Sequence, residues 1–186
     1  MQNWRENLDD VLDMAWATLR GHRGARGGFP GLAVLSTIGE DGAPTSRAMV
    51  LRRVDRAGGI IDMYSDSETP KVRQIAADPR VAVQLWASQQ RIQLRLSGQA
   101  AIITGPPAQE EWRRVPDHAI VNYGVVPPPG TPIAAPNAYE RRPEQGRFAV
   151  LRITVETIEL VHLGEPCHIR AAFRRANGWA GHWLAP

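Results

Sequence analysis

The sequence predicts a mainly β fold of the α+β class, an antiparallel barrel or roll with peripheral helices. Two observations support this prediction. About eight segments show β-type alternation of apolar and polar residues, and turns rich in Gly, Pro, Asn or Asp separate most of them. Helical periodicity is confined to the N-terminus and to short stretches between strands. A chain of 186 residues is long enough for one domain with its own core, so we expect a single domain over residues 1–186.

The N-terminal segment, residues 1–21, has the period of an amphipathic helix. Apolar residues recur at helical spacing over residues 3–20, and Gly21 is expected to end the helix. A glycine-rich linker, residues 24–31, then leads to the first strand. The apolar positions of the helix are Trp4, Leu8, Val11, Leu12, Ala15 and Leu19.

The first half of the β region predicts an antiparallel meander, because short alternating runs are joined by Gly-containing turns. A short helix over residues 69–77 interrupts it, with Thr69 as the N-cap and Pro70 at the first helical position. Asp78-Pro79 is expected to stop this helix. The predicted strands span residues 32–38, 43–54, 60–65, 80–87 and 91–104.

The second half predicts a helix from Pro106-Pro107 to Arg114, followed by a long loop over residues 116–146. This loop is rich in Pro, Gly and Asn, and a loop of that length in a compact domain is usually functional or disordered. Alternation returns over residues 148–163. Residues 167–175 and 179–184 are expected to form a hairpin across Asn177-Gly178, a strong short-range hairpin signal.

Composition argues for a cytoplasmic protein that binds neither membranes nor nucleic acids. No run approaches the ~18 apolar residues of a membrane span, and the polar, acidic first ten residues do not resemble a signal peptide. Cys167 is the only cysteine, so no internal disulfide can form. The pI is about 9.6, but the arginines are scattered among acidic residues rather than clustered as phosphate contacts require.

Searches for general catalytic motifs find no dinucleotide-binding glycine pattern, P-loop, nucleophile elbow or metalloprotease motif. The five histidines lack the short spacings of zinc sites, so no metal is expected. Cys167 would need a base to act as a nucleophile, and its neighbour His168 would point to the opposite face of a strand.

The remaining signal is a group of phosphate-binding side chains near strand ends. Arg47 and Arg52 flank an apolar strand segment, which taken alone is more typical of a buried strand with two solvated arginines than of a binding site. Tyr64-Ser65 closes the next strand, and Lys71, the only lysine, lies in the first turn of the following helix. A hydroxyl, a guanidinium, an ammonium and a helix N-terminus would converge there, which predicts a phosphate site.

Five segments then follow a recognisable order. They are Arg-Ala-Met-Val-Leu-Arg at 47–52, Tyr-Ser at 64–65 with Lys71, Asp-Pro-Arg-Val-Ala-Val at 78–83 with Trp86, Gln-Leu-Arg-Leu-Ser-Gly at 93–98, and His-Ile-Arg at 168–170 with Trp179 and a final Leu-Ala-Pro. Together they resemble the pyridoxamine 5′-phosphate oxidase-like superfamily, and most of all its Alr4036-type FMN-binding branch. The resemblance implies an FMN-binding split β-barrel.

The resemblance also implies roles for individual residues. Arg47 and Lys71 would hold the FMN phosphate, helped by the Ser65 hydroxyl next to Tyr64. The backbone of the strand would face the isoalloxazine ring, and Gln93 and Arg170 would reach the flavin from the second subunit of a homodimer. A small-molecule substrate would contact His168 and Arg114. The ring-facing strand residues are Met49, Val50, Leu51 and Arg52.

The sequence departs from the superfamily pattern mainly where the oxidases bind their phosphorylated substrate. Arg52 replaces a lysine, and Pro70 stands where one phosphate-binding arginine is usual. The Arg-Pro-x-x-Ser substrate segment has no clear match within 112–118, and residues 166–168 read Pro-Cys-His instead of Arg-Leu-His. Three hypotheses follow: an FMN-dependent oxidoreductase of unknown substrate, a non-catalytic flavin carrier or sensor, and a true pyridoxamine/pyridoxine 5′-phosphate oxidase.

Overall fold

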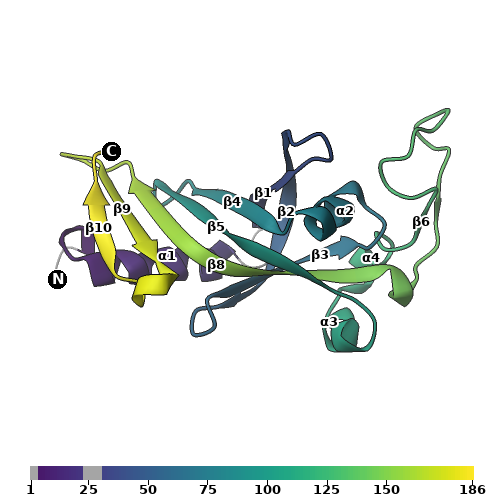
Figure 1. Cartoon of the computed structure of the whole chain (residues 1–186), viewed down its shortest axis with the longest axis horizontal. Helices are drawn as coiled ribbons and strands as arrows, with labels where there is room; N and C mark the ends of the chain where they lie inside the picture. The colour runs from purple at the N-terminus through teal and green to yellow at the C-terminus, as the bar shows by residue number, and fades with distance from the viewer. Residues whose placement is uncertain (1–3, 23–30) are drawn as a thin grey trace.

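The computed structural model describes residues 4–22 and 31–186. Its centre is a closed antiparallel barrel of six strands (Figure 1), which confirms the predicted class. Going round the barrel, the order is β1-β2-β3-β8-β5-β4, and β4 closes it by pairing with β1. These strands are β1 Leu32–Ile38, β2 Pro44–Asp55, β3 Ile60–Asp66, β4 Arg80–Ala87, β5 Ile92–Ile103 and β8 Phe148–His162.

The long strand β8 connects the two ends of the molecule. Its first half pairs with β3, its second half pairs with β9 Ile169–Arg174, and nearly its whole length pairs with β5. Strand β10 Gly181–Leu184 adds to β9 at the edge. The core lies inside the barrel because alternate residues point inward, as the strictly alternating burial of β4 illustrates.

Helix α1, Leu8–His22, covers the end of the barrel near the C-terminal hairpin (Figure 1). Its apolar face is buried, and Trp16 contacts Trp179 edge-on with ring centroids 5.8 Å apart. The predicted bounds were wrong at both ends. Asn7 caps the helix by accepting hydrogen bonds from the backbone N–H groups of Asp9 and Asp10, so a separate 3-10 turn, Trp4–Glu6, precedes it.

The helix also continues through Gly21 to His22, because a single glycine only weakens a helix. The predicted glycine-rich linker falls almost entirely on residues 23–30, outside the described residues. No helix in the described part of the chain is long and apolar enough to span a bilayer.

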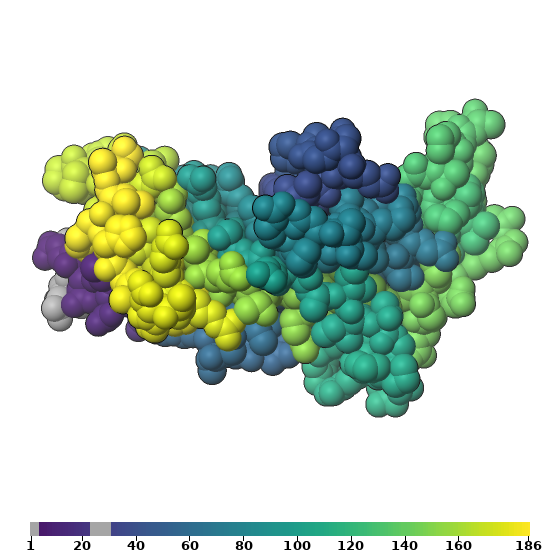
Figure 2. Space-filling view, viewed as in Figure 1, coloured from purple at the N-terminus to yellow at the C-terminus, as the bar shows by residue number. Residues whose placement is uncertain are grey.

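The 116–146 segment is not a single structureless loop. It contains α4 Asp117–Ile120, the pair β6 Val125–Val126 and β7 Glu140–Arg141, and the 3-10 turn Gln145–Arg147. The stretch from β6 to β7, here called the arm (residues 125–141), projects from the body of the molecule (Figure 2). Before it, the predicted helix after Pro106 is a 3-10 turn, Pro106–Ala108, followed by α3 Gln109–Trp112.

The predicted C-terminal hairpin is confirmed, since β9 and β10 pair antiparallel. The strands are shorter than expected, and the connection is longer than a two-residue turn. A 3-10 turn, Arg175–Asn177, is ended by Gly178 in the left-handed conformation at φ 64°, which glycine adopts without strain.

His162, at the end of β8, is a buried histidine that contacts the N-terminal segment. Its ring lies 5.3 Å from that of Trp4 in an edge-on contact, and only 7% of the residue is exposed. Burial, and then the charges of Arg5, Arg91 and His168, lower the pKa of His162 below 6.5.

We therefore expect the free energy of unfolding to fall as the pH drops below 6.5, because the unfolded chain takes up the proton first. Urea unfolding at about pH 7.5 and about pH 5.5 measures this, and His162→Gln should show a smaller loss than the wild type. An equal loss in both proteins would show that His162 does not cause the dependence.

Candidate functional site

Two adjoining cavities lie at the end of the barrel where β2 and β3 approach the 106–147 region. The first, called the strand–helix cavity, measures about 400 Å³. The second, called the outer cavity, measures about 540 Å³ and is lined by Leu51, Arg52, Arg53, Tyr64, Glu111, Arg114 and Pro116. Arg52 and Tyr64 line both. The strand–helix cavity is lined by Ala48, Met49, Val50, Arg52, Tyr64, Ser65, Asp66, Thr69, Lys71, Asn122, Tyr123 and Pro129.

At one end of the strand–helix cavity, the cation Lys71 lies at the N-terminus of a helix. Helix α2, Pro70–Ala77, begins after Thr69 as predicted, with Pro70 in its first turn. The Thr69 side chain does not cap the helix; its hydroxyl lies 3.0 Å from that of Ser65. Lys71 Nζ donates to Ser65 Oγ at 3.1 Å. Lysine, hydroxyl groups and the positive end of the helix dipole therefore gather as an anion-binding group.

The electrostatics of Lys71 favour an anion at this place. Burial lowers the pKa of Lys71, the charge of Arg47 lowers it further, and Asp66 opposes this. A lysine that is partly desolvated beside a second cation gains more from a bound anion than an exposed lysine does. The predicted grouping of Lys71 with Ser65 is present in the structure.

Arg47 lies close by but does not line the cavity. Its guanidinium is held between β1 and α2, where it donates to Thr37 Oγ1 at 2.7 Å, Thr45 Oγ1 at 3.0 Å and Gln74 Oε1 at 3.0 Å. Arg47 therefore lies outside the cavity lining, but close enough to Lys71 for its charge to lower the Lys71 pKa. Direct contact between Arg47 and a phosphate stays a prediction.

Strand β2 forms the long wall of the strand–helix cavity. Met49 and Val50 line it, whereas Leu51 is fully buried and reaches only the outer cavity. The β2–β3 register shifts between Leu51 and Arg53, so Arg52 is the extra residue of a bulge. This irregularity places the Arg52 side chain at the boundary of the two cavities.

The outer cavity contains a fixed carboxylate. Tyr64 donates its hydroxyl to Glu111 Oε2 at 2.7 Å, and Arg114 Nη1 donates to Glu111 Oε1 at 3.1 Å. Burial and the hydrogen bond to Glu111 raise the pKa of Tyr64, so its hydroxyl stays a donor. Arg114, a predicted substrate residue, also pairs with Glu110, and two carboxylates therefore offset its charge.

Asp66, at the end of β3, ties the 116–147 segment to the barrel. Its side chain is 2% exposed and accepts hydrogen bonds from Gly124 N at 2.8 Å and Arg147 Nη2 at 2.8 Å. Only glycine fits at position 124, because φ is +105° and a Cβ would lie 1.9 Å from the Arg142 carbonyl oxygen. This anchor brings Asn122, Tyr123 and Pro129 to the cavity wall.

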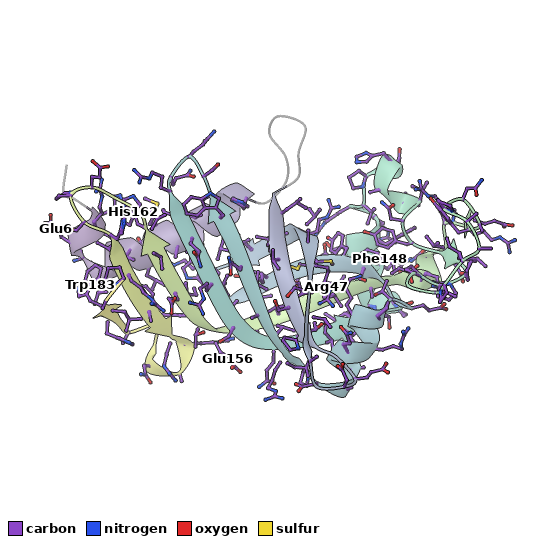
Figure 3. All side chains as sticks on the ribbon, turned by 90° about the horizontal axis from the view of Figure 1, so that it is seen from above. Glu6, Arg47, Phe148, Glu156, His162 and Trp183 are labelled. Atoms are coloured by element: carbon purple, nitrogen blue, oxygen red, sulfur yellow. The ribbon has the colours of Figure 1, made fainter. Side chains whose placement is uncertain are left out.

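Gln93 and Arg170 lie together, but at the other end of the barrel. Both are opposite Val161 near the end of β8, whereas Tyr64 is opposite Val150 near its start. Eleven residues of extended strand span roughly 35 Å, and Figure 3 labels Phe148 and His162, which bound β8, well apart. Arg170 Nη2 pairs with Glu159 at 3.0 Å, and His168 lies just before β9.

Sequence reasoning missed several residues that shape the site: Asp66, Glu111, Asn122, Tyr123 and Pro129. The signal for Asn122 to Pro129 was the length and composition of the 116–146 segment, which pointed to a functional loop without naming a position. Glu111 precedes Arg114 by three residues, a spacing that favours an ion pair but does not reveal the contact with Tyr64. Among the described residues, no three His, Cys, Asp or Glu side chains gather as a metal site.

Comparisons with known proteins agree with this architecture. A solved pyridoxamine 5′-phosphate oxidase-related, FMN binding protein from Nostoc punctiforme superposes with a TM-score of 0.72 at 22% identity, covering 100% of this chain and 99% of that one. PhzG from Burkholderia lata, solved in complex with tetrahydrophenazine-1-carboxylic acid, gives 0.71 at 19% identity, covering 95% and 91%. The fold is therefore the split barrel of pyridoxamine 5′-phosphate oxidase-like proteins.

Sequence comparison assigns the family. The pyridoxamine 5′-phosphate oxidase family matches residues 30–162, and the chain belongs to it. Pyridoxine/pyridoxamine 5′-phosphate oxidases from Agrobacterium fabrum and Azorhizobium caulinodans are 26% and 28% identical over 157 residues, 84% of this chain. The match spans 66% and 64% of those proteins. The narrower Alr4036-type assignment stays a prediction.

Proposed function

We propose that this chain binds FMN in the strand–helix cavity and acts as an FMN-dependent oxidoreductase on a small molecule. The observation that carries the proposal is the half-buried Lys71 beside the buried Ser65 at the N-terminus of α2, at one end of a cavity walled by β2. Relatives named as pyridoxine/pyridoxamine 5′-phosphate oxidases and a solved FMN binding protein of this fold support it. Bound flavin would supply the electron and hydride chemistry.

The residues present fit such a cofactor. The volume of about 400 Å³ lies within the usual range of small-molecule sites. The phosphate would be held by Lys71, Ser65 and the start of α2. Arg47, close to Lys71 but outside the cavity lining, would add positive charge. Met49, Val50 and Tyr64 would border the ring, and Pro129 of the arm together with Tyr123 would exclude water from it.

We further propose that the complete site needs two chains. Gln93 and Arg170 lie roughly 35 Å along β8 from the β3 end that carries Ser65, too far to contact the same ligand within one chain. They lie on an outward face that also exposes Val34 and Trp86, at 41% and 46%. A homodimer that buries this face would bring Gln93 and Arg170 of one chain to the flavin of the other.

Mixing two defective variants tests the shared site. Lys71→Met and Arg170→Met each damage one half of it, so each homodimer alone should bind FMN weakly. After the chains are exchanged, mixed dimers should regain one intact site, about a quarter of all sites if chains pair at random. FMN titration of the mixture measures this fraction, and no recovery after demonstrated exchange would contradict a shared site.

The pyridoxamine/pyridoxine 5′-phosphate oxidase hypothesis makes a separate prediction. Binding a phosphorylated pyridine requires a second anion site, but Arg114 is already paired with Glu110 and Glu111. We expect the FMN-loaded protein to form pyridoxal phosphate far below ~1 s⁻¹, the low end of ordinary turnover. The assay is pyridoxal phosphate production under air, and turnover near that rate would show that other groups rebuild the site.

The alternative of a flavin carrier or sensor is distinguished by reduction chemistry. An oxidoreductase should accept electrons from NADH or NADPH into its flavin and pass them to an acceptor, whereas a carrier or sensor should do so no faster than free flavin.

A further inference from the structure

The boundary between the two cavities carries a cation without an anionic partner. The buried Nε of Arg52 has no hydrogen-bond partner within the described residues, and its guanidinium lies 5.5 Å from the centre of the Tyr64 ring. The neighbouring Arg53 pairs with Asp55 at 2.9 Å, and Arg114 pairs with Glu110 and Glu111. Arg52 is therefore the cation in the outer cavity that is open to an anionic ligand.

The outer cavity also contains the carboxylate of Glu111, which hydrogen bonds hold in place. The Glu111 side chain is 13% exposed, and both its carboxylate oxygens are engaged, one by Tyr64 and one by Arg114. Any ligand group bound at Arg52 therefore lies in a cavity that also contains a negative charge. A ligand with two negative charges is repelled more strongly by Glu111 than a ligand with one.

From the unpaired Arg52 and the fixed Glu111 we propose that the outer cavity accepts a ring compound carrying a single carboxylate. Arg52 binds this carboxylate, and Glu111 selects against phosphate esters. A carboxylate matches the planar fork of one guanidinium, whereas a phosphate dianion brings a second charge that needs a second cation. Leu51, Tyr64 and Pro116 provide apolar surface for the ring. The identification of this ligand as the substrate rests on the proposed function, because it assumes flavin in the adjoining cavity.

The test compares three probes that share a phenyl ring: benzoate, phenyl phosphate and benzamide. At pH 8 benzoate carries one charge, phenyl phosphate is mostly a dianion because its second pKa is about 6, and benzamide is neutral. Calorimetric titration of the full chain, both flavin-free and FMN-loaded, gives the affinities without any turnover. We expect benzoate to bind roughly tenfold or more tighter than either other probe, the scale of a hydrogen bond to a charged group.

Three variants separate the roles. Arg52→Gln should weaken benzoate binding roughly ten- to hundredfold. Glu111→Gln should strengthen phenyl phosphate binding more than benzoate binding. The difference in affinity between benzoate and phenyl phosphate should therefore become smaller. Arg113→Gln is the control, because Arg113 is exposed and lines neither cavity, and it should change neither affinity.

Two results would overturn the proposal without any variant: phenyl phosphate binding as tightly as benzoate, or neither charged probe binding more tightly than benzamide. A Glu111→Gln protein that remains folded by circular dichroism but shifts both charged probes equally would overturn the selective role of Glu111. A failure to take up FMN contradicts the proposed function instead, since the flavin-free titration still reports on Arg52 and Glu111.

Discussion

Replacing Asp66 by alanine should lower the free energy of unfolding by about 3–5 kcal/mol, the usual loss when one partner of a buried ion pair is removed. The Asp66 and Arg147 side chains are only 2% and 12% exposed. The variant would leave Arg147 with only the half-exposed Glu68 as an ion-pair partner, and the N–H groups of Glu68 and Gly124 without their acceptor. Urea unfolding followed by circular dichroism measures the change.

The matched control is Glu68→Gln. Glu68 also contacts Arg147, at 3.3 Å, but its side chain is 49% exposed, so this ion pair should contribute no more than about 1 kcal/mol. Because Asp66 anchors the segment that carries Tyr123 and Pro129, Asp66→Ala should also expose this segment to proteolysis. Equal destabilisation by the two substitutions would mean that Asp66 is not the anchor.

Replacing Lys71 by methionine should weaken FMN binding roughly ten- to hundredfold, since a hydrogen bond to a charged group contributes about 1.5–3 kcal/mol. Methionine keeps most of the side-chain length and removes the charge. Titration of the flavin-free variant, followed by quenching of flavin fluorescence, gives the dissociation constant.

Arg73→Met is the matched control for Lys71→Met, because it removes one positive charge from the same helix. Arg73 is 58% exposed and lies near Glu40, outside the cavity lining. Its substitution should leave FMN affinity within about twofold, since charges exposed to solvent are largely screened. Equal losses in the two variants would reduce the role of Lys71 to its contribution to net charge.

Strands β1 and β4 could be predicted from the sequence because buried residues alternate with more exposed ones along them. The bounds predicted for β1 and β4, residues 32–38 and 80–87, agree with the structure. The start of α1 could not be read from apolar spacing alone, because Asn7 caps the helix inside the periodic segment. The short elements of residues 116–146 are fixed by tertiary contacts, above all those of Asp66, and leave little periodic signal.

The candidate site was predictable where its residues are local in sequence. Tyr64, Ser65 and Lys71 lie on adjoining elements, so their convergence follows from one strand and one helix. Glu111 and Asp66 act across 47 and 58 residues of chain, to Tyr64 and Gly124, and sequence patterns do not carry such pairings. The position of Arg47 depends on Thr37 and Gln74, which lie 10 and 27 residues away in the chain and share no sequence pattern with it.

We propose that the strand–helix cavity binds FMN through the phosphate of the cofactor. Equilibrium dialysis of the flavin-free chain against FMN and against riboflavin, which has the same ring system without the phosphate, measures the contribution of the phosphate. We expect one FMN per chain and riboflavin binding weaker by roughly tenfold or more, because only FMN offers an anion to Lys71. Riboflavin binding as tightly as FMN, or no binding of either, would contradict it.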